Sequence, residues 1–312
     1  MPTWRSTLDR AGISGSRLRN DYTHAARRVV RREPAPYLAL RLLAEPSLVP
    51  WLAAGLAFMN LVDDVAETGT PQQRNAGLTA LAERVGAALE TGDSPDPLLR
   101  AYAHTVSTRA LPAQWVSRFL DGAATAEAAF DGFGTEEDFQ TYLDDYAWPG
   151  VLVFTGLQYQ GGPDAEQAAG WRRFVDAAQR VDFLADLAGD LADGRLCIPR
   201  ARLAEHEVTR ADLEQARDTP AVRALLAAEA RRARTALEAT DGILGLAEPG
   251  LRPVVATMAE LMAHQLTAVE RAGAAALRRD VGYGLVAPLR TLARARTGRS
   301  RQAVARASSK DR

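Results

Sequence analysis

The sequence contains almost no segment that alternates apolar and polar residues in the manner of a β-strand. Runs rich in Val, Ile and Thr with a period of two are missing, whereas Ala, Leu, Arg and Glu dominate. Proline and glycine fall mainly between long apolar-periodic segments. The pattern predicts helices near residues 36–45, 48–67, 72–90, 113–130, 136–158, 165–192, 219–245 and 250–278.

The length of the chain permits a sizeable core. The 312 residues are 47% hydrophobic, and no linker is long or polar enough to divide them, so we expect one all-α domain. The most apolar stretch, 48–62, contains Pro50 and is too short to span a bilayer, which predicts a buried core helix. Residues 298–312 are Arg/Ser-rich without apolar periodicity and are expected to form a frayed, flexible tail.

The charge balance argues against a nucleic-acid partner. The formal net charge is −1, and outside the tail both signs are interspersed, so no global field recruits nucleic acid or anionic lipid. The single cysteine, Cys197, excludes an internal disulfide, which suits the cytoplasm. A peripheral membrane contact through the basic tail is an open alternative, and either a monomer or a homodimer agrees with the sequence.

The segment 181–193 carries four aspartates at helical spacing. At about 100° per residue they fall within an arc of roughly 80°, beside an apolar sector. Asp is a poor helix former, like charges four residues apart repel, and no arginine lies among them. A solvated acidic stripe is the alternative, but this arrangement favours a hard external cation such as Mg2+. The four are Asp182, Asp186, Asp190 and Asp193.

A second acidic cluster ends the apolar stretch near residue 62. Asp63, Asp64 and Glu67 follow an uncharged run and precede a Gly-Thr-Pro break. Acids at a helix end are common, yet carboxylates at a helix C-terminus oppose the macrodipole. Two acidic clusters on helices that are apolar behind the acids indicate a bundle with a metal-lined central cavity.

These clusters resemble the motifs of the squalene and phytoene synthases. The first family motif reads Asp-Asp-x-x-Asp, and residues 63–67 are similar to it with Glu67 as the last acid. The second reads Gln-x-x-Asn-x-x-x-Asp-x-x-x-Asp followed by Gly-Arg-x-Tyr-x-Pro, and residues 179–199 match its spacing. The second motif with its tail is the more specific of the two.

The resemblance extends beyond the two motifs. Residues 36–43 resemble the N-terminal helix entry of the family, and residues 142–150 resemble its mid-chain helix pair. The similarity covers about residues 20–297, which leaves residues 1–19 as an N-terminal extension.

The resemblance implies an isoprenoid-synthase fold, which is a single all-α bundle around a central cavity, and a Mg2+-dependent prenyltransferase. In such an enzyme two or three Mg2+ ions bind the diphosphate of a prenyl donor, the C–O bond ionises, and a carbon nucleophile captures the allylic cation. The implied metal ligands are Asp63, Glu67, Asp182, Asp186 and Asp190. The implied catalytic acids are Asp63, Asp64, Asp186 and Asp190. The implied diphosphate partners are Gln179, Arg195, Arg279 and Arg290.

Several positions depart from the family pattern. Leu56 and Asn60, both expected to border the substrate, stand where the family has a Tyr and an Arg, and that Arg helps hold a second diphosphate. Asp182 replaces the Asn of the second motif, and Cys197 replaces the Tyr of its tail. Trp148 replaces a mid-chain glycine, where an indole is expected to reshape the prenyl channel. The first diphosphate site is therefore expected to be retained and the second to be lost.

These departures favour transfer of a prenyl group from one allylic diphosphate to a carbon of an acceptor that carries no diphosphate. Some actinobacterial enzymes of this kind prenylate aromatic alkaloids such as carbazoles in secondary metabolism, and the chain is similar to them. An aromatic acceptor would use Tyr142, Tyr146 and Trp148 as cavity walls, although ordinary core packing also explains these residues.

Two other functions remain open. The first is the head-to-head condensation of two prenyl diphosphates to a hydrocarbon, as in squalene or phytoene synthesis, which makes the acceptor an isoprenoid. The second is a non-catalytic partner that keeps the fold. Loss of acids would be expected in such a protein, whereas the second motif here has gained one at Asp182.

Overall fold

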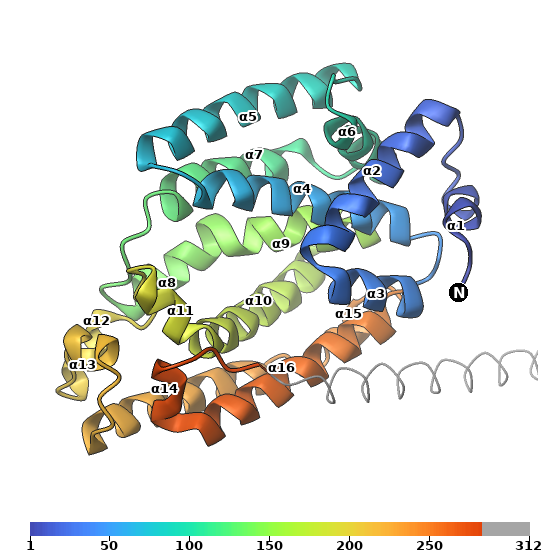
Figure 1. Ribbon diagram of the computed structural model, residues 1–312. Helices are drawn as coiled ribbons and strands as arrows, with labels where there is room; N and C mark the ends of the chain where they lie inside the picture. Colours follow the sequence, from blue (N-terminus) through green and yellow to red (C-terminus); the bar gives the residue numbers. More distant parts are fainter. Residues whose placement is uncertain (283–312) are drawn as a thin grey trace, which may run out of the picture.

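The computed structural model describes residues 1–282, and in this range the chain is helical with no strand, as predicted (Figure 1). The α-helices are α1 (Trp4–Arg10), α2 (Ser16–Arg32), α3 (Pro34–Leu43), α4 (Val49–Glu67), α5 (Pro71–Thr91), α6 (Pro97–Arg109), α7 (Ala113–Gly122), α8 (Glu136–Tyr142), α9 (Trp148–Thr155), α10 (Ala165–Ala185), α11 (Leu187–Ala192), α12 (Arg200–Glu205), α13 (Arg210–Glu214), α14 (Pro220–Glu238), α15 (Ile243–Leu246) and α16 (Arg252–Ala272). Short π or 3-10 segments are η1 (Ala123–Glu127), η2 (Leu143–Ala147), η3 (Gly156–Gln158) and η4 (Gly273–Leu277). The predicted tail 298–312 and Arg290 lie outside the described residues.

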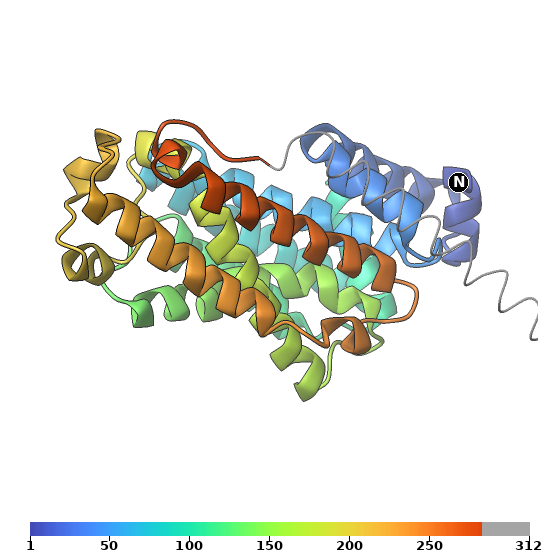
Figure 2. The ribbon, with the colours of Figure 1, turned by 90° about the horizontal axis from the view of Figure 1, so that it is seen from below.

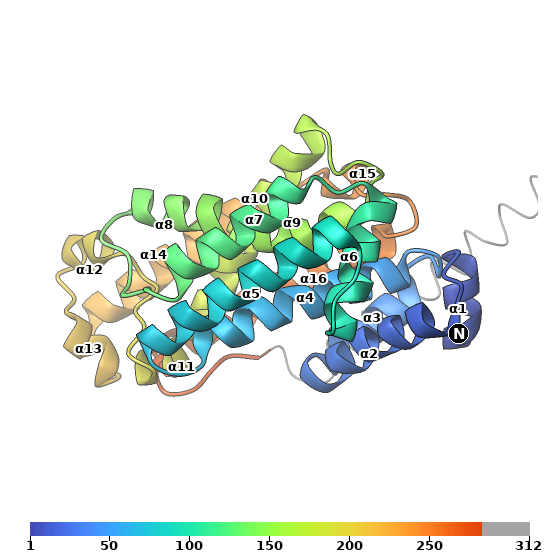
Figure 3. The same ribbon diagram turned by 90° about the horizontal axis from the view of Figure 1, so that it is seen from above.

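The long helices form layers around α4, α9 and α10. In Figure 3, α5 and α7 lie over α4 and α9, and in Figure 2, α14 and α16 lie across α10 on the opposite side. α2 packs against α4 and α6 at one end of the molecule. The N-terminal residues 1–19 are also packed onto this end, because Leu8 and Ile13 are buried in the core.

Most predicted helices are present, but the long helices α2 and α6 and the short helices α1, α12 and α13 were not predicted. The mean hydropathy of α2 is low because arginines cover its outer face, and its buried stripe uses two alanines beside Tyr22 and Val29. Alanine gives a weak apolar signal, so a helix whose stripe relies on it is hard to recognise from periodicity. In α6 the apolar residues are interrupted by polar ones that the core accepts, such as the fully buried Thr105.

Helix α4 is the central core helix. It is the one described helix that is long and apolar enough to cross a membrane, and 72% of its most apolar window is buried inside the fold. Its side chains face α2, α5, α6 and α9, so nearly every residue before Asn60 lies against protein. This burial confirms the prediction of a core helix for the apolar stretch.

The predicted continuous helices 113–130 and 136–158 are interrupted by π segments where they cross. η1 follows α7, and η2 joins α8 to α9. The crossing is very close: a Cβ placed on Gly122 would lie 1.9 Å from the carbonyl oxygen of Asp145. Only glycine permits this approach of two backbones, and the wider π turn shifts the register of the side chains that follow.

The predicted helix 165–192 is broken at Asp186, where α10 ends and α11 begins. Asp186 has φ −98° and ψ 12°, outside the helical region, and the segment of chain that follows η4 fills the break. The Val281 amide donates to the carbonyl of Ala185 at 2.7 Å, and the Gly189 amide donates to the Asp280 carboxylate at 2.9 Å. These bonds satisfy backbone groups that the interruption leaves without helical partners.

The close crossing at Gly122 generates a stability prediction. Gly122→Ala should lower the free energy of unfolding by about 1–3 kcal/mol or more, because the new Cβ has only backbone atoms to displace. Gly86→Ala is the matched control, since Gly86 lies in the middle of α5 and nothing lies within 4 Å of the position that a Cβ would take there. It should stabilise the protein by about 0.5–1 kcal/mol. Urea unfolding measures the free energy of unfolding of both variants. Equal changes in the two variants would contradict the close contact between Gly122 and the backbone at Asp145.

Candidate active site

A cavity of about 820 Å3 opens between the C-terminal halves of α4 and α10 and the π segments. Its wall is partly apolar and aromatic, and it is otherwise strongly acidic. The apolar and aromatic side chains of the wall are Met59, Phe119, Phe130, Tyr142, Tyr146, Ala147, Val151 and Phe183. The charged and amide side chains are Asp63, Glu67, Arg74, Glu127, Gln179, Asp182, Asp186, Asp190, Asp193 and Arg195.

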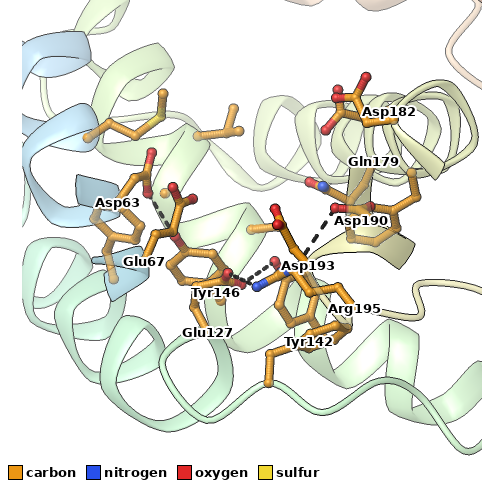
Figure 4. A pocket seen from close by; sticks show the side chains of 18 of the residues that line it. Asp63, Glu67, Glu127, Tyr142, Tyr146, Gln179, Asp182, Asp190, Asp193 and Arg195 are labelled. Carbon is orange, nitrogen blue, oxygen red and sulfur yellow. Dashed lines mark hydrogen bonds and ion pairs between the residues drawn. The ribbon is translucent and has the colours of Figure 1, made fainter. Parts of the chain in front are cut away.

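Helix α4 contributes Asp63 and Glu67, which lie one turn apart and both face the cavity (Figure 4). The hydroxyl of Tyr146 donates a hydrogen bond to Asp63 at 2.7 Å. Burial, and then the charges of Glu67 and Glu127, raise the pKa of Asp63 to about 7 in spite of that bond. The surroundings therefore disfavour a negative charge on Asp63 unless a cation joins it.

The opposite wall carries the aspartates of the second motif. Asp182 lies on the last turn of α10, Asp186 at the break, and Asp190 on α11, and Figure 4 shows Asp182 and Asp190 across the cavity from Asp63. Asp182 is open to the cavity yet crowded by protein atoms. Burial, followed by the charges of Asp186 and Asp190, raises its pKa to about 6. Burial and neighbouring acids also raise the pKa values of Asp186 and Asp190.

Between the two walls lies a buried group that sequence reasoning did not identify. Glu127 of η1 is 3% exposed, accepts a hydrogen bond from the Tyr142 hydroxyl at 2.8 Å, and forms a 2.8 Å ion pair with Arg195. The Arg195 guanidinium also lies over the Phe130 ring, 4.5 Å from its centroid. The largely apolar segment 113–130 contains two acids, Asp121 and Glu127, and nothing in the sequence marks Glu127 as the buried one.

Some residues expected at the site lie outside the cavity wall. Asp64 faces the other side of α4, where Arg28 and Arg32 pair with it. A helix turns by about 100° per residue, so Asp64 points in a different direction from Asp63, toward the arginines of α2. This partnership neutralises Asp64 within the fold.

Three positions that were expected to border the substrate are not among the residues that line this cavity. Leu56 and Asn60 are buried in the core around α4 and are not among the residues that line the cavity. Trp148 packs edge-on against Trp115, with ring centroids 6.2 Å apart, and does not line the cavity either. Tyr142 and Tyr146, at and within the π segment η2, line the cavity, whereas Trp148 packs against the core beside α7. Arg279 is exposed at the end of the described chain and is also absent from the wall.

Cys197 is held as a thiol. Its Sγ atom donates to a carboxylate oxygen of Asp190 at 3.3 Å, and burial, followed by the charge of Asp190, raises the pKa of the thiol. A protonated thiol is a poor nucleophile, so covalent catalysis by Cys197 is disfavoured. The side chain instead orients one acid of the second motif.

The carboxylates fit a cation that brings some of its own ligands. No group of three or more His, Cys, Asp and Glu side chains in residues 1–282 is gathered closely enough to hold an ion by itself. Mg2+ in phosphate-processing sites commonly keeps waters and uses one or two carboxylates together with substrate phosphate oxygens. The hard oxygen donors lie on two facing walls, and burial together with neighbouring acids raises the pKa values of Asp63, Asp182 and Asp186, which agrees with that mode of binding.

Neutralising one of these acids should stabilise the protein when divalent cations are absent. We expect Asp182→Asn to raise the Tm in EDTA by a few degrees, because the fold disfavours the ionised carboxylate at neutral pH. Adding Mg2+ with inorganic pyrophosphate should raise the Tm of the unmodified protein more than that of the variant. Asp241→Asn, an exposed site on a turn, is the control with no expected change. A Tm for Asp182→Asn in EDTA equal to or below that of the unmodified protein would contradict the assigned charge repulsion.

Comparison with known proteins identifies relatives of this chain. Residues 29–286 match the model of the family described as squalene/phytoene synthase. A bifunctional protein CrtB/UppS of Streptomyces coelicolor is 28% identical over 191 residues; the match covers 61% of this chain but only 34% of that protein. The chain thus spans about a third of the length of this relative.

Solved structures share the architecture. Squalene synthase HpnC from Alicyclobacillus acidocaldarius is 26% identical with a TM-score of 0.68, covering 86% of this chain and 96% of that one. A dehydrosqualene synthase is 18% identical with a TM-score of 0.77, covering 91% and 98% of the two chains, and here the likeness concerns the fold alone. Since the family match extends over most of the sequence and the fold agrees, the chain belongs to the squalene/phytoene synthase family of prenyltransferases.

Proposed function

We propose that this enzyme transfers the prenyl group of one allylic diphosphate to a carbon of an acceptor without a diphosphate, most favourably an aromatic ring such as that of a carbazole. The observation that carries the proposal is the position of Asn60. The family pattern expects an Arg here that serves a second diphosphate, and Asn60 is instead neutral, 1% exposed and outside the cavity wall.

The remaining arginine of the second motif offers little to another diphosphate. Arg195 already pairs with the buried Glu127, and a carboxylate oxygen of Asp190 lies 4.0 Å from it. An additional diphosphate would have to compete with Glu127 for this guanidinium, leaving a buried carboxylate uncompensated. The charges at the site therefore favour one diphosphate rather than two.

The aromatic part of the wall suits both the intermediate and the acceptor. Tyr146 stacks on Phe119 with ring centroids 5.6 Å apart, and the centroids of the Tyr142 and Phe130 rings are 5.7 Å apart. The faces of such rings stabilise a cation, and they also stack on a planar acceptor. An apolar wall keeps water away from a carbocation that would otherwise be hydrolysed.

The carboxylates of both motifs have a separate task. Asp63 and Glu67 on one wall and Asp182, Asp186 and Asp190 on the other are the groups that would hold Mg2+. When bound, Mg2+ would neutralise the negative charge of the departing diphosphate. Tyr146 holds Asp63 by its hydrogen bond, and the Cys197 thiol holds Asp190, so two of these acids have fixed orientations before substrate binds.

Head-to-head condensation is the second candidate. The similarity to squalene synthase HpnC, which extends over 96% of that chain, favours it. It requires two diphosphates at the site and would release two pyrophosphates per product, whereas prenyl transfer to an aromatic acceptor releases one.

Incubation with Mg2+ and dimethylallyl, geranyl, farnesyl or geranylgeranyl diphosphate, each with and without a panel of carbazoles and indoles, separates the two. We expect a prenylated aromatic product and one pyrophosphate per product, measured by mass spectrometry and a pyrophosphate assay. Formation of only a squalene- or phytoene-type hydrocarbon, from the donor alone, would refute the proposal and establish the second candidate.

The acids of the second motif should be essential for turnover. Asp186→Ala should reduce kcat by about a hundredfold or more, since it removes a proposed metal ligand. The circular dichroism spectrum should be retained, because alanine is the better helix former. The control is Asp241→Ala, which removes an exposed carboxylate far along the chain from both motifs and should leave kcat unchanged. Retained activity in Asp186→Ala would mean that the metal face has been assigned to the wrong residues.

A further inference from the structure

Arg74 is the one arginine in the cavity wall of residues 1–282 that has no carboxylate partner. In this range the wall contains seven acids and two arginines, Arg74 and Arg195, and the second of these is paired with Glu127. No ion pair joins the Arg74 guanidinium to an acid in the described part of the chain, and its Nε atom is buried without a hydrogen-bond acceptor. The Nε atoms of Arg28 and Arg232 are also buried without an acceptor, but each of those guanidinium groups forms an ion pair through another nitrogen, whereas Arg74 has no counter-charge among the described residues.

The other arginines near the first motif show that pairing is the rule here. Arg28 and Arg32 reach Asp64 from α2, and Arg32 also lies 3.9 Å from Glu67. Arg74 and the acids line the same cavity, yet no ion pair joins them in the described part of the chain. A guanidinium that lines an acidic cavity and stays unpaired is available to an anion that enters with its own cations.

The position of Arg74 is set by the turn between α4 and α5. The acidic end of α4 is followed by a short turn with Gly69 at φ +94°, and Thr70 then caps α5 in a reciprocal capping box with Gln73. Arg74 follows at once, in the first turn of α5. A Cβ placed on Gly77 would lie 2.9 Å from the Val65 side chain, so this end of α5 is packed directly against α4.

The location is unfavourable for a cation by local rules. Cations are disfavoured in the first turn of a helix because the macrodipole is positive there, and the first turn of α5 contains no acid that would offset Arg74. Neither a cap, nor an ion pair, nor the dipole accounts for an arginine at this position. A bound anion would account for it, because it would be attracted by both the guanidinium and the helix end.

We propose that Arg74 binds the diphosphate of the prenyl donor and supplies a permanent positive charge at this first diphosphate site. The planar guanidinium presents two parallel N–H donors that match two phosphate oxygens. It would hold the diphosphate on the α4 and α5 side of the cavity while the carboxylates engage the accompanying metal ions. This inference rests on the proposed use of a prenyl diphosphate and extends it to a residue outside both acidic motifs.

Binding of inorganic pyrophosphate with Mg2+, measured by isothermal titration calorimetry, tests the assignment without turnover. Arg74→Gln should weaken pyrophosphate binding about tenfold or more, the loss expected from a charge-assisted hydrogen-bonded pair. Arg74→Lys, which keeps the charge but loses the fork, should bind with intermediate affinity. Arg84→Gln is the matched control: Arg84 lies on the same helix, is exposed, and among the described residues donates a hydrogen bond only to a backbone carbonyl of α5, so affinity should not change.

Kinetics provide a second measurement. Arg74→Gln should raise the KM for the prenyl diphosphate about tenfold, with a smaller effect on kcat, and should leave the KM for the acceptor unchanged. Unaltered pyrophosphate affinity in Arg74→Gln, with a circular dichroism spectrum like that of the unmodified protein, would refute the role of Arg74 and leave the proposed function standing. Failure of the unmodified protein to bind pyrophosphate with Mg2+ would instead refute the proposed function itself.

Discussion

Repulsion among carboxylates that face one cavity is the constraint on which the rest of this structure depends. Within residues 1–282, seven acids line the space, and only Glu127 has a close ion-pair partner among the arginines of the wall. Burial raises the pKa values of Asp63 and Asp182 because taking these groups from water without a counter-charge is costly. The helices that carry them are held together by the apolar core behind the acids, so the fold maintains a site that is unfavourable until cations and an anion enter it.

The distribution of arginines complements this arrangement. Arginines are abundant, but those near the site form their closest ion pairs with acids other than the proposed metal ligands. Arg28 and Arg32 neutralise Asp64 on the side of α4 that faces α2. Arg195 neutralises Glu127 between the two walls. The two opposed sets of acids therefore remain available to metal ions, and Arg74 remains available to phosphate. A site with these charges favours a donor that is a single metal-bound diphosphate.

Departures from regular helix geometry position the side chains that matter. The close crossing at Gly122 is accompanied by π turns in both chain segments, and from these turns Glu127, Tyr142 and Tyr146 reach the cavity. The break at Asp186 lets α11 change direction while Asp186 and Asp190 both still face the cavity, and the Asp280–Val281 segment closes the break. Functional groups are thus placed by irregular backbone that the surrounding packing stabilises.

The sequence by itself determined the helical class, the course of α4 as a core helix and the two acidic motifs, because apolar periodicity and residue spacing are local properties of the chain. It did not predict that Asp64 and Trp148 lie outside the cavity wall, since the phase of a helix depends on what packs against it, and a π turn changes that phase. It also did not single out Glu127 or Arg74, because one acid or one arginine among many carries no signal until distant helices place it in a shared cavity. Whether a charge is neutralised or left available was decided only by tertiary structure, because ion pairs such as Arg28–Asp64 and Arg195–Glu127 join residues far apart in the chain.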